Sequence, residues 1–153
     1  MRHLAQLSNS ANEIFTDYRY RSNGTGSFVY IVDSGLDWDG NVFNNRPFIF
    51  KNFHLPEEVQ EDIFGSGTNV AALAVGKDLG VAPAAGLGVI NIGFRVRIGG
   101  QNIISEVYTK GSLSFGILTA LESIVSRHEE KNSVICLSLR KYIIHTFLWT
   151  LGI

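Results

Sequence analysis

The residues best suited to chemistry lie in two short polar stretches, Asp33-Ser34-Gly35 and Gly65-Ser66-Gly67-Thr68. The first follows an apolar run, FVYIV, and the second precedes an apolar run of small residues. A carboxylate can orient or hold a proton, whereas a serine hydroxyl becomes a nucleophile only when a base removes its proton. Ser66 could pair with Asp33 as a nucleophile served by another base, or it could cap the helix that follows.

Two nucleotide-binding patterns fail at this glycine-rich stretch. A phosphate-binding P-loop requires a lysine after its second glycine, and the sequence has none there. A dinucleotide fingerprint requires a third glycine where Val70 stands, and the preceding EEVQEDIF does not resemble a strand. We therefore expect no nucleotide cofactor, and we expect no metal ion or other cofactor either.

Three buried strands and two helices are expected to position these residues. Apolar runs predict strands over 27–33, 86–94 and 133–139, and small apolar residues predict a helix over 67–75. A second helix has an apolar face and a serine able to cap its start, at Ser112 or Ser114; the face comprises Leu113, Ile117, Leu121, Ile124 and Val125. Residues 37–60 are expected to be irregular, and residues 97–110 to be a looser connection.

Alternating strands and helices predict a parallel sheet covered on both faces. Chemistry in such sheets collects at the carboxyl ends of the strands, so Asp33 and the turn at 65–69 are well placed to be functional. Asp33 could instead cap a helix or a turn.

Composition excludes several classes of protein. The chain has 153 residues and a net charge of −1, and no basic cluster is long enough to follow a phosphate backbone, so no nucleic acid partner is expected. No apolar run reaches the roughly 20 residues of a membrane span, and the first residues lack the apolar core of a signal peptide. The compartment stays open. The one cysteine, Cys136, lies in an apolar run and is expected to be a small buried residue.

Five segments together resemble one enzyme family, the subtilisin-like serine proteases (peptidase family S8), and its proteinase K-like branch in particular. IVDSGLD resembles the family's aspartate motif, and DIFGSGTNVAALAVG its histidine motif. The order, spacing and predicted elements agree over roughly residues 4–139. The other three segments are GVAPAAGLGVINI, KGSLSFGILTAL and SVICLSL.

The resemblance implies an α/β fold with a doubly wound parallel sheet, here truncated to the N-terminal half. It also implies an ancestral Asp-His-Ser triad for peptide hydrolysis. Asp33 matches the triad aspartate, and Ser66 occupies the position of the triad histidine. A serine hydroxyl cannot act as a general base near neutral pH, so Ser66 is expected to be non-functional in that role. His3, His54, His128 and His145 offer no obvious substitute.

The resemblance ends at Leu139, where Arg140 takes the place of a glycine. The expected division is a partial peptidase domain over 1–139 and a divergent apolar tail over 140–153. The tail could cover an exposed sheet edge, or it could be an unselected extension. The family's nucleophile and oxyanion-hole asparagine lie in the half that the match does not reach.

The function expected from the resemblance is therefore a subtilisin-like endopeptidase homologue that is inactive as this chain stands. The alternative is a non-catalytic pseudoprotease that binds a peptide or a protein. Gly111, Ser138 and Leu139 match parts of the family's substrate-binding segments, although Arg140 would obstruct the path of a bound peptide. A third hypothesis is an active enzyme, with unusual residues or with a second chain that supplies the missing half.

Overall fold

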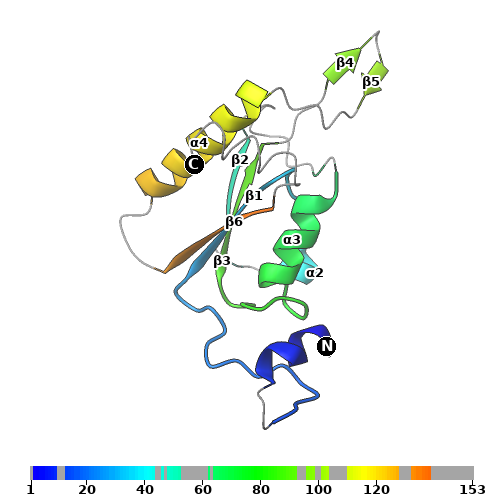
Figure 1. Ribbon diagram of the computed structural model, residues 1–153, viewed down its shortest axis with the longest axis vertical. Helices are drawn as coiled ribbons and strands as arrows, with labels where there is room; N and C mark the ends of the chain where they lie inside the picture. The colour runs from blue at the N-terminus through cyan, green and yellow to red at the C-terminus, as the bar shows by residue number, and fades with distance from the viewer. Residues whose placement is uncertain are drawn as a thin grey trace.

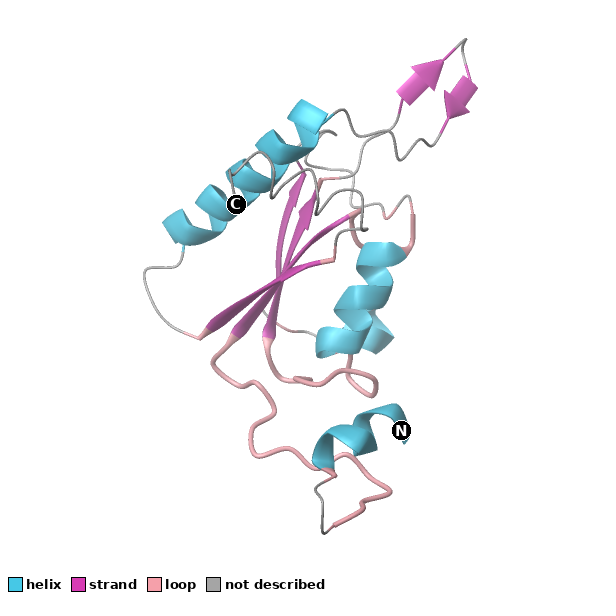
Figure 2. Ribbon diagram, in the orientation of Figure 1, coloured by secondary structure: helices cyan, strands magenta, loops and turns pink. Residues whose placement is uncertain are grey.

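The computed structural model is a twisted parallel sheet with helices on both faces (Figures 1 and 2). It describes residues 2–9, 13–43, 46, 48–52, 62, 64–92, 96–98, 101–103, 110–127 and 132–138. The described part begins with a short helix α1 (Arg2–Ala5) and a 3-10 turn η1 (Gln6–Ser8). The predicted N-terminal half of a doubly wound α/β fold is confirmed in its class.

The main sheet has four parallel strands in the order β2-β3-β1-β6. They are β1 (Phe28–Asp33), β2 (Phe48–Asn52), β3 (Gly86–Asn91) and β6 (Ser133–Leu137). β1 and β3 lie at the centre, and most of their apolar side chains are buried, on both faces, as expected for strands of a covered parallel sheet. Because β1 pairs in register with β3, Asp33 stands beside Asn91 at the carboxyl edge.

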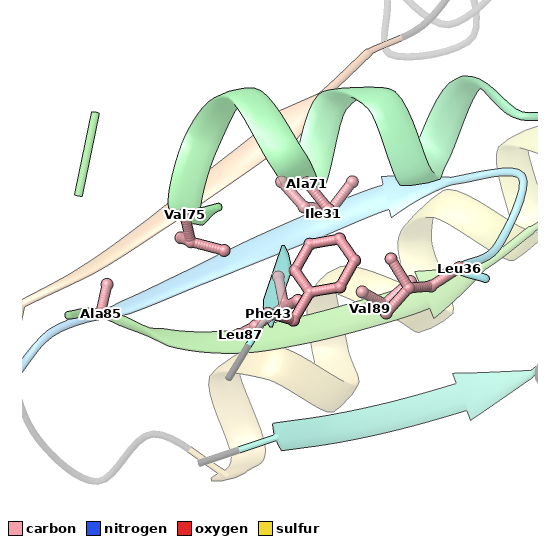
Figure 3. Packing of buried hydrophobic residues seen from close by; sticks show 8 residues of the cluster. All are labelled: Ile31, Leu36, Phe43, Ala71, Val75, Ala85, Leu87 and Val89. Atoms are coloured by element: carbon pink, nitrogen blue, oxygen red, sulfur yellow. The ribbon is translucent and has the colours of Figure 1, made fainter. Parts of the chain in front are cut away.

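Helices α2 (Gly40–Phe43) and α3 (Ser66–Val75) lie on one face of the sheet, and α4 (Lys110–Arg127) lies on the other (Figure 1). On the α3 face, Ala71 and Val75 pack against Ile31 and Val89 (Figure 3). On the α4 face, Ile117, Ala120 and Ile124 pack against Tyr30 and Val32. Two apolar layers therefore hold β1 in place between α3 and α4.

Several predictions about the elements need correction. Strand β2 lies inside the segment expected to be irregular, and its aromatic residues extend the sheet at an edge. An antiparallel hairpin, β4 (Val96–Ile98) and β5 (Gln101–Ile103), lies partly inside the expected loose connection. The Gly99-Gly100 pair between its strands is a hairpin turn sequence that the prediction overlooked.

The second helix was placed correctly, and its predicted cap and one residue of its predicted face were wrong. α4 begins at Lys110, so Ser112 and Ser114 lie inside the helix instead of capping it. Ile117 and Ile124 are buried and Leu121 packs against them, whereas Val125 is exposed because it lies beside the buried stripe rather than within it. Leu113 lies among residues whose side chains are not described.

Candidate functional site at the ends of β1 and α3

The end of β1 and the start of α3 meet at the carboxyl edge of the sheet. Gly35 follows β1 with a φ of 124°, a left-handed conformation that favours glycine and turns the chain sharply. Gly67 lies directly against this turn, so that a Cβ added to Gly67 would overlap the carbonyl oxygen of Gly35. The two glycines allow the backbones to approach closely, and this approach brings Asp33 and Ser66 together.

Asp33 and Ser66 are joined by a short hydrogen bond. The Ser66 hydroxyl donates to Oδ1 of Asp33 over 2.5 Å, and the Ser34 backbone N–H donates to the same oxygen over 2.7 Å. Asp33 is only 6% exposed, and its Oδ2 has no hydrogen-bond partner among the described residues. The two residues that the sequence singled out thus form a direct contact, while one carboxylate oxygen is left buried without a donor.

Ser34 links this pair to a second carboxylate. Its hydroxyl donates to Oδ1 of Asp62 over 2.6 Å and lies 2.8 Å from the Ser66 hydroxyl. Ser34 and Asp62 are both buried. A chain of hydroxyl groups therefore connects Asp33, at the end of a strand, with Asp62, which lies ahead of helix α3.

Asp62 accepts hydrogen bonds from most of the turn that starts α3. Its Oδ1 accepts from the backbone N–H groups of Phe64 and Gly65, over 3.3 and 2.9 Å. Its Oδ2 accepts from the backbone N–H and the hydroxyl of Thr68, over 2.7 and 2.6 Å. Together with the bond from Ser34, one carboxylate satisfies donors that would otherwise be orphaned at a helix N-terminus.

The pKa of Asp62 reflects two opposing effects. Burial raises the pKa, because it disfavours the charged form. The hydrogen bonds from Ser34, from the side chain and backbone of Thr68, and from the Gly65 backbone stabilise the carboxylate and lower the pKa. The net result is a pKa below the ordinary value, so Asp62 is ionised at neutral pH.

The prediction that Ser66 caps α3 is wrong. Gly65 is the N-cap residue, with a φ of 72°, and Ser66 is the first helical residue. The N–H groups at the helix start are satisfied from outside the helix instead, with Gly67 N–H donating to the Ser34 hydroxyl over 3.2 Å and Thr68 N–H donating to Asp62. The Ser66 hydroxyl is therefore committed to Asp33.

The other predicted site residues are more scattered. Gly111 lies in the first turn of α4, and Ser138 is exposed just after β6. Leu139, the tail over 140–153, His54, His128 and His145 lie outside the described residues. The substrate-binding roles of Gly111, Ser138 and Leu139, and the domain boundary at residue 139, therefore remain predictions.

Two residues of the site were missed as candidates. Ser34 stands inside the aspartate motif and Asp62 is the first residue of the histidine motif, so both residues lie within the segments that match the family. Their role depends on a contact between residues 28 positions apart, which spacing along the chain does not reveal.

Cys136 of β6 is only half-buried, which corrects the expectation of a fully buried residue. It aligns with Ile31 of β1 on the α3 face of the sheet. It is close enough to Asp33 for the carboxylate to disfavour the negatively charged thiolate. Burial raises the pKa of the Cys136 thiol, and the Asp33 carboxylate raises it further. The thiol is therefore not an activated nucleophile, because such groups have a lowered pKa.

Replacing Ser66 with alanine is expected to lower the free energy of unfolding by about 1–2 kcal/mol, because Asp33 loses a donor to a buried charge. Urea denaturation at pH 7 would measure this change. Ser126→Ala is the matched control, since its exposed hydroxyl donates to the Ser123 carbonyl one turn earlier in the same helix. Equal effects of the two substitutions would contradict a structural role for the contact between Ser66 and Asp33.

The described residues contain no helix that is long and apolar enough to cross a membrane. Among the same residues, no group of three or more His, Cys, Asp or Glu side chains is arranged to hold a metal ion.

Comparison of the sequence with known proteins finds proteases as relatives. No family model matches the sequence. Subtilisin-like proteinase Mp1 of Magnaporthiopsis poae is 31% identical over 126 residues, which are 81% of this chain and 30% of that protein. Alkaline protease 1 of Aspergillus clavatus is 31% identical over 125 residues, or 81% of this chain and 28% of that protein. The chain thus spans less than a third of the length of these curated relatives.

A solved structure shows the same fold. The crystal structure of a cold adapted subtilisin-like serine proteinase has a TM-score of 0.62 and 16% sequence identity. The similarity covers 99% of this chain and 52% of the solved chain. The matched motifs, the parallel sheet and these relatives agree: the chain belongs to the subtilisin-like serine protease family (peptidase family S8) and corresponds to the N-terminal part of its domain.

Proposed function

We propose that this chain is a catalytically inactive subtilisin homologue in which Ser66 has replaced the base of the triad. The observation that carries the proposal is the contact between Ser66 and Asp33. A hydroxyl, not an imidazole, lies 2.5 Å from the buried carboxylate that matches the family's aspartate.

A triad base must accept the nucleophile's proton and later return it. Ser66 is a donor in its contact with Asp33, and a serine hydroxyl has too little basicity to accept a proton at neutral pH. Replacing a catalytic base therefore removes proton transfer even where the aspartate and the surrounding frame persist. In subtilisin itself, loss of the histidine alone lowers kcat by a factor of about 2 × 10⁶.

A Ser66–Asp33 dyad with Ser66 as the nucleophile has less support. The hydroxyl proton is directed to a carboxylate, which is a weak base for an alcohol at neutral pH. The same hydroxyl also lies 2.8 Å from Ser34, in a part-buried network that favours a fixed orientation. The network supports a structural role for Ser66.

The test combines a turnover assay with active-site labelling. We expect the 153-residue chain to release no dye from casein labelled with a fluorophore, and to show no labelling by a fluorophosphonate probe. A subtilisin-type protease in the same buffers is the positive control. Labelling that disappears in Ser66→Ala but persists in the control Ser126→Ala would overturn the proposal, because it would identify Ser66 as a nucleophile.

A second candidate function is non-catalytic binding of a peptide or a protein. Strand β6 supports it, because it is an outer strand of the sheet that the structure describes, and a strand at a sheet edge is the kind of element to which a bound peptide can add as a further strand. Binding at a fixed stoichiometry in a calorimeter, without turnover, would favour this function over a chain that only retains an ancestral fold.

A further inference from the structure

The segment that leads into β1 contains a sequence that can accept an N-linked glycan. The acceptor pattern is an asparagine, any residue except proline, and then a serine or a threonine. Asn23-Gly24-Thr25 is its one occurrence in the chain. Such a short pattern also arises by chance, so it indicates a usable site only where the folded chain leaves the acceptor amide accessible.

The side chain of Asn23 turns its oxygen toward Thr25 and its NH2 group away from it. Oδ1 accepts from the Thr25 backbone N–H over 3.1 Å and from the Thr25 hydroxyl over 2.7 Å. A backbone N–H can only donate, so the amide atom that faces it is the oxygen. Nδ2, the atom to which a glycan attaches, is not buried and donates no hydrogen bond to any residue that the structure describes.

The backbone of this turn is anchored to the fold without using the acceptor amide. The Ala84 N–H donates to the Asn23 carbonyl over 2.9 Å. Gly24 has a φ of 89°, and a Cβ added there would lie 2.9 Å from the Cβ of Ala82. The middle position therefore requires glycine, which the acceptor pattern allows. Thr25, which supplies the hydroxyl of the pattern, is exposed.

We propose that Asn23 is an acceptor site for an N-linked oligosaccharide, which an oligosaccharyltransferase takes from a lipid-diphosphate-linked donor. In the transfer, a bond forms between Nδ2 and C1 of the first sugar, and the bond between C1 and the diphosphate oxygen breaks. The lipid diphosphate leaves with the bonding electron pair. The amide nitrogen gives one proton to a base of the transferase.

The attachment point lies away from the candidate functional site. Asn23 precedes β1, whereas Asp33 is its last residue (Figure 1). The six residues of β1 span about 20 Å at the usual rise of a strand. A glycan on Asn23 thus begins at the opposite edge of the sheet from Asp33 and Ser66. The modification goes beyond the proposed function and does not rest on the lack of catalysis.

The alternative is that the Asn23 side chain serves the turn alone. Asn23→Asp separates the two roles, because aspartate keeps an oxygen acceptor for both Thr25 donors but has no NH2 group. Thr25→Ser keeps the hydroxyl of the pattern, and Thr25→Val removes it at nearly the same size. These three variants differ little in shape from the wild type.

The test produces the full 153-residue chain in yeast behind a cleavable secretion leader, whose removal shows that a molecule reached the lumen. We expect molecules without the leader to carry one glycan, which peptide N-glycosidase in heavy-oxygen water releases while converting Asn23 to labelled aspartate. Thr25→Ser is expected to keep the glycan, and Asn23→Asp and Thr25→Val to lose it. Mass spectrometry of the denatured chains measures occupancy, so a loss of stability in a variant does not affect the result.

Urea denaturation then compares the glycosylated wild type with Asn23→Asp. We expect equal midpoints, because Nδ2 donates no hydrogen bond to the described fold. Three outcomes would overturn the proposal: lumenal wild-type chain without a glycan, an N-linked glycan that persists in Asn23→Asp, or a glycosylated chain that fails to fold where Asn23→Asp folds. The last outcome would show that the acceptor amide faces the protein and not the solvent.

Discussion

Replacing Asp62 with asparagine is expected to lower the free energy of unfolding by about 3 kcal/mol, more than the loss expected of Ser66→Ala. The Asp62 carboxylate accepts five hydrogen bonds, which come from Ser34, Phe64, Gly65 and, twice, Thr68. In asparagine, an NH2 group replaces one of the two carboxylate oxygens, so one acceptor becomes a donor. Whichever way the amide points, at least one backbone N–H of the turn then faces an N–H instead of an acceptor.

Urea denaturation followed by circular dichroism measures this loss. Asp39→Asn is the matched control, because Asp39 is an exposed aspartate whose Oδ1 accepts a hydrogen bond from the Asn41 N–H. It removes the same charge and retains an acceptor for that bond. Equal stabilities of the two variants would show that Asp62 does not hold the start of α3.

The pH dependence gives an independent check. The folded pKa of Asp62 lies below the unfolded value of about 3.9. The ionised carboxylate therefore stabilises the fold fully above that unfolded value, and the contribution is lost as the pH falls through the folded pKa. The difference in stability between the wild type and Asp62→Asn is expected to be constant from about pH 5 to 7, which lies above the unfolded pKa of about 3.9. The difference is expected to shrink in more acidic solution.

Gly67→Ala is expected to destabilise the fold by about 3 kcal/mol, at the upper end of the usual cost of overpacking. The new Cβ would overlap the carbonyl oxygen of Gly35 and lie 3.1 Å from its backbone nitrogen. Both are backbone atoms of a sharp turn, so no flexible side chain can move aside. Separating the two backbones would also lengthen the bond from Gly67 N–H to Ser34.

Thermal and urea unfolding measure the effect, with Gly26→Ala as the control. Gly26 has a φ of 76° and open space around its Cβ position, so alanine there meets only the backbone cost of about 1–2 kcal/mol. A smaller loss at Gly67 than at Gly26 would contradict a close approach of the two glycine turns. A subsidiary result expected of Gly67→Ala is faster hydrogen exchange of the first amides of α3.

Much of the fold could be predicted because the central elements carry unambiguous patterns. The runs that form β1 and β3 are short, apolar and bounded by glycine or polar residues, which favours buried strands, and the small residues after Gly67 predict α3. β2 was missed because its FIFKN sequence is short and its aromatic residues also suit an irregular surface segment. Such an edge strand is defined by its partner β3 and only weakly by its own residues.

The location of the site was predicted, but its hydrogen-bond network was not. Asp33 and Ser66 were found because parallel strands end at one edge and because both stand in recognisable motifs. The role of Ser66 was misjudged because Gly65, in its left-handed conformation, starts the helix one residue earlier than a serine cap would. Asp62 was overlooked because its partners come together only after β1 and α3 have packed.

The capping of α3 from outside has a consequence for how the sequence can change. Ser34 and Asp62 satisfy the first N–H groups of the helix, so the helix start does not depend on the side chain at position 66. A substitution there alters the partner of Asp33 but leaves the turn, the helix and the strand end in place. The residue that faces Asp33 can therefore change in evolution while the turn, the helix and the strand end around it are retained.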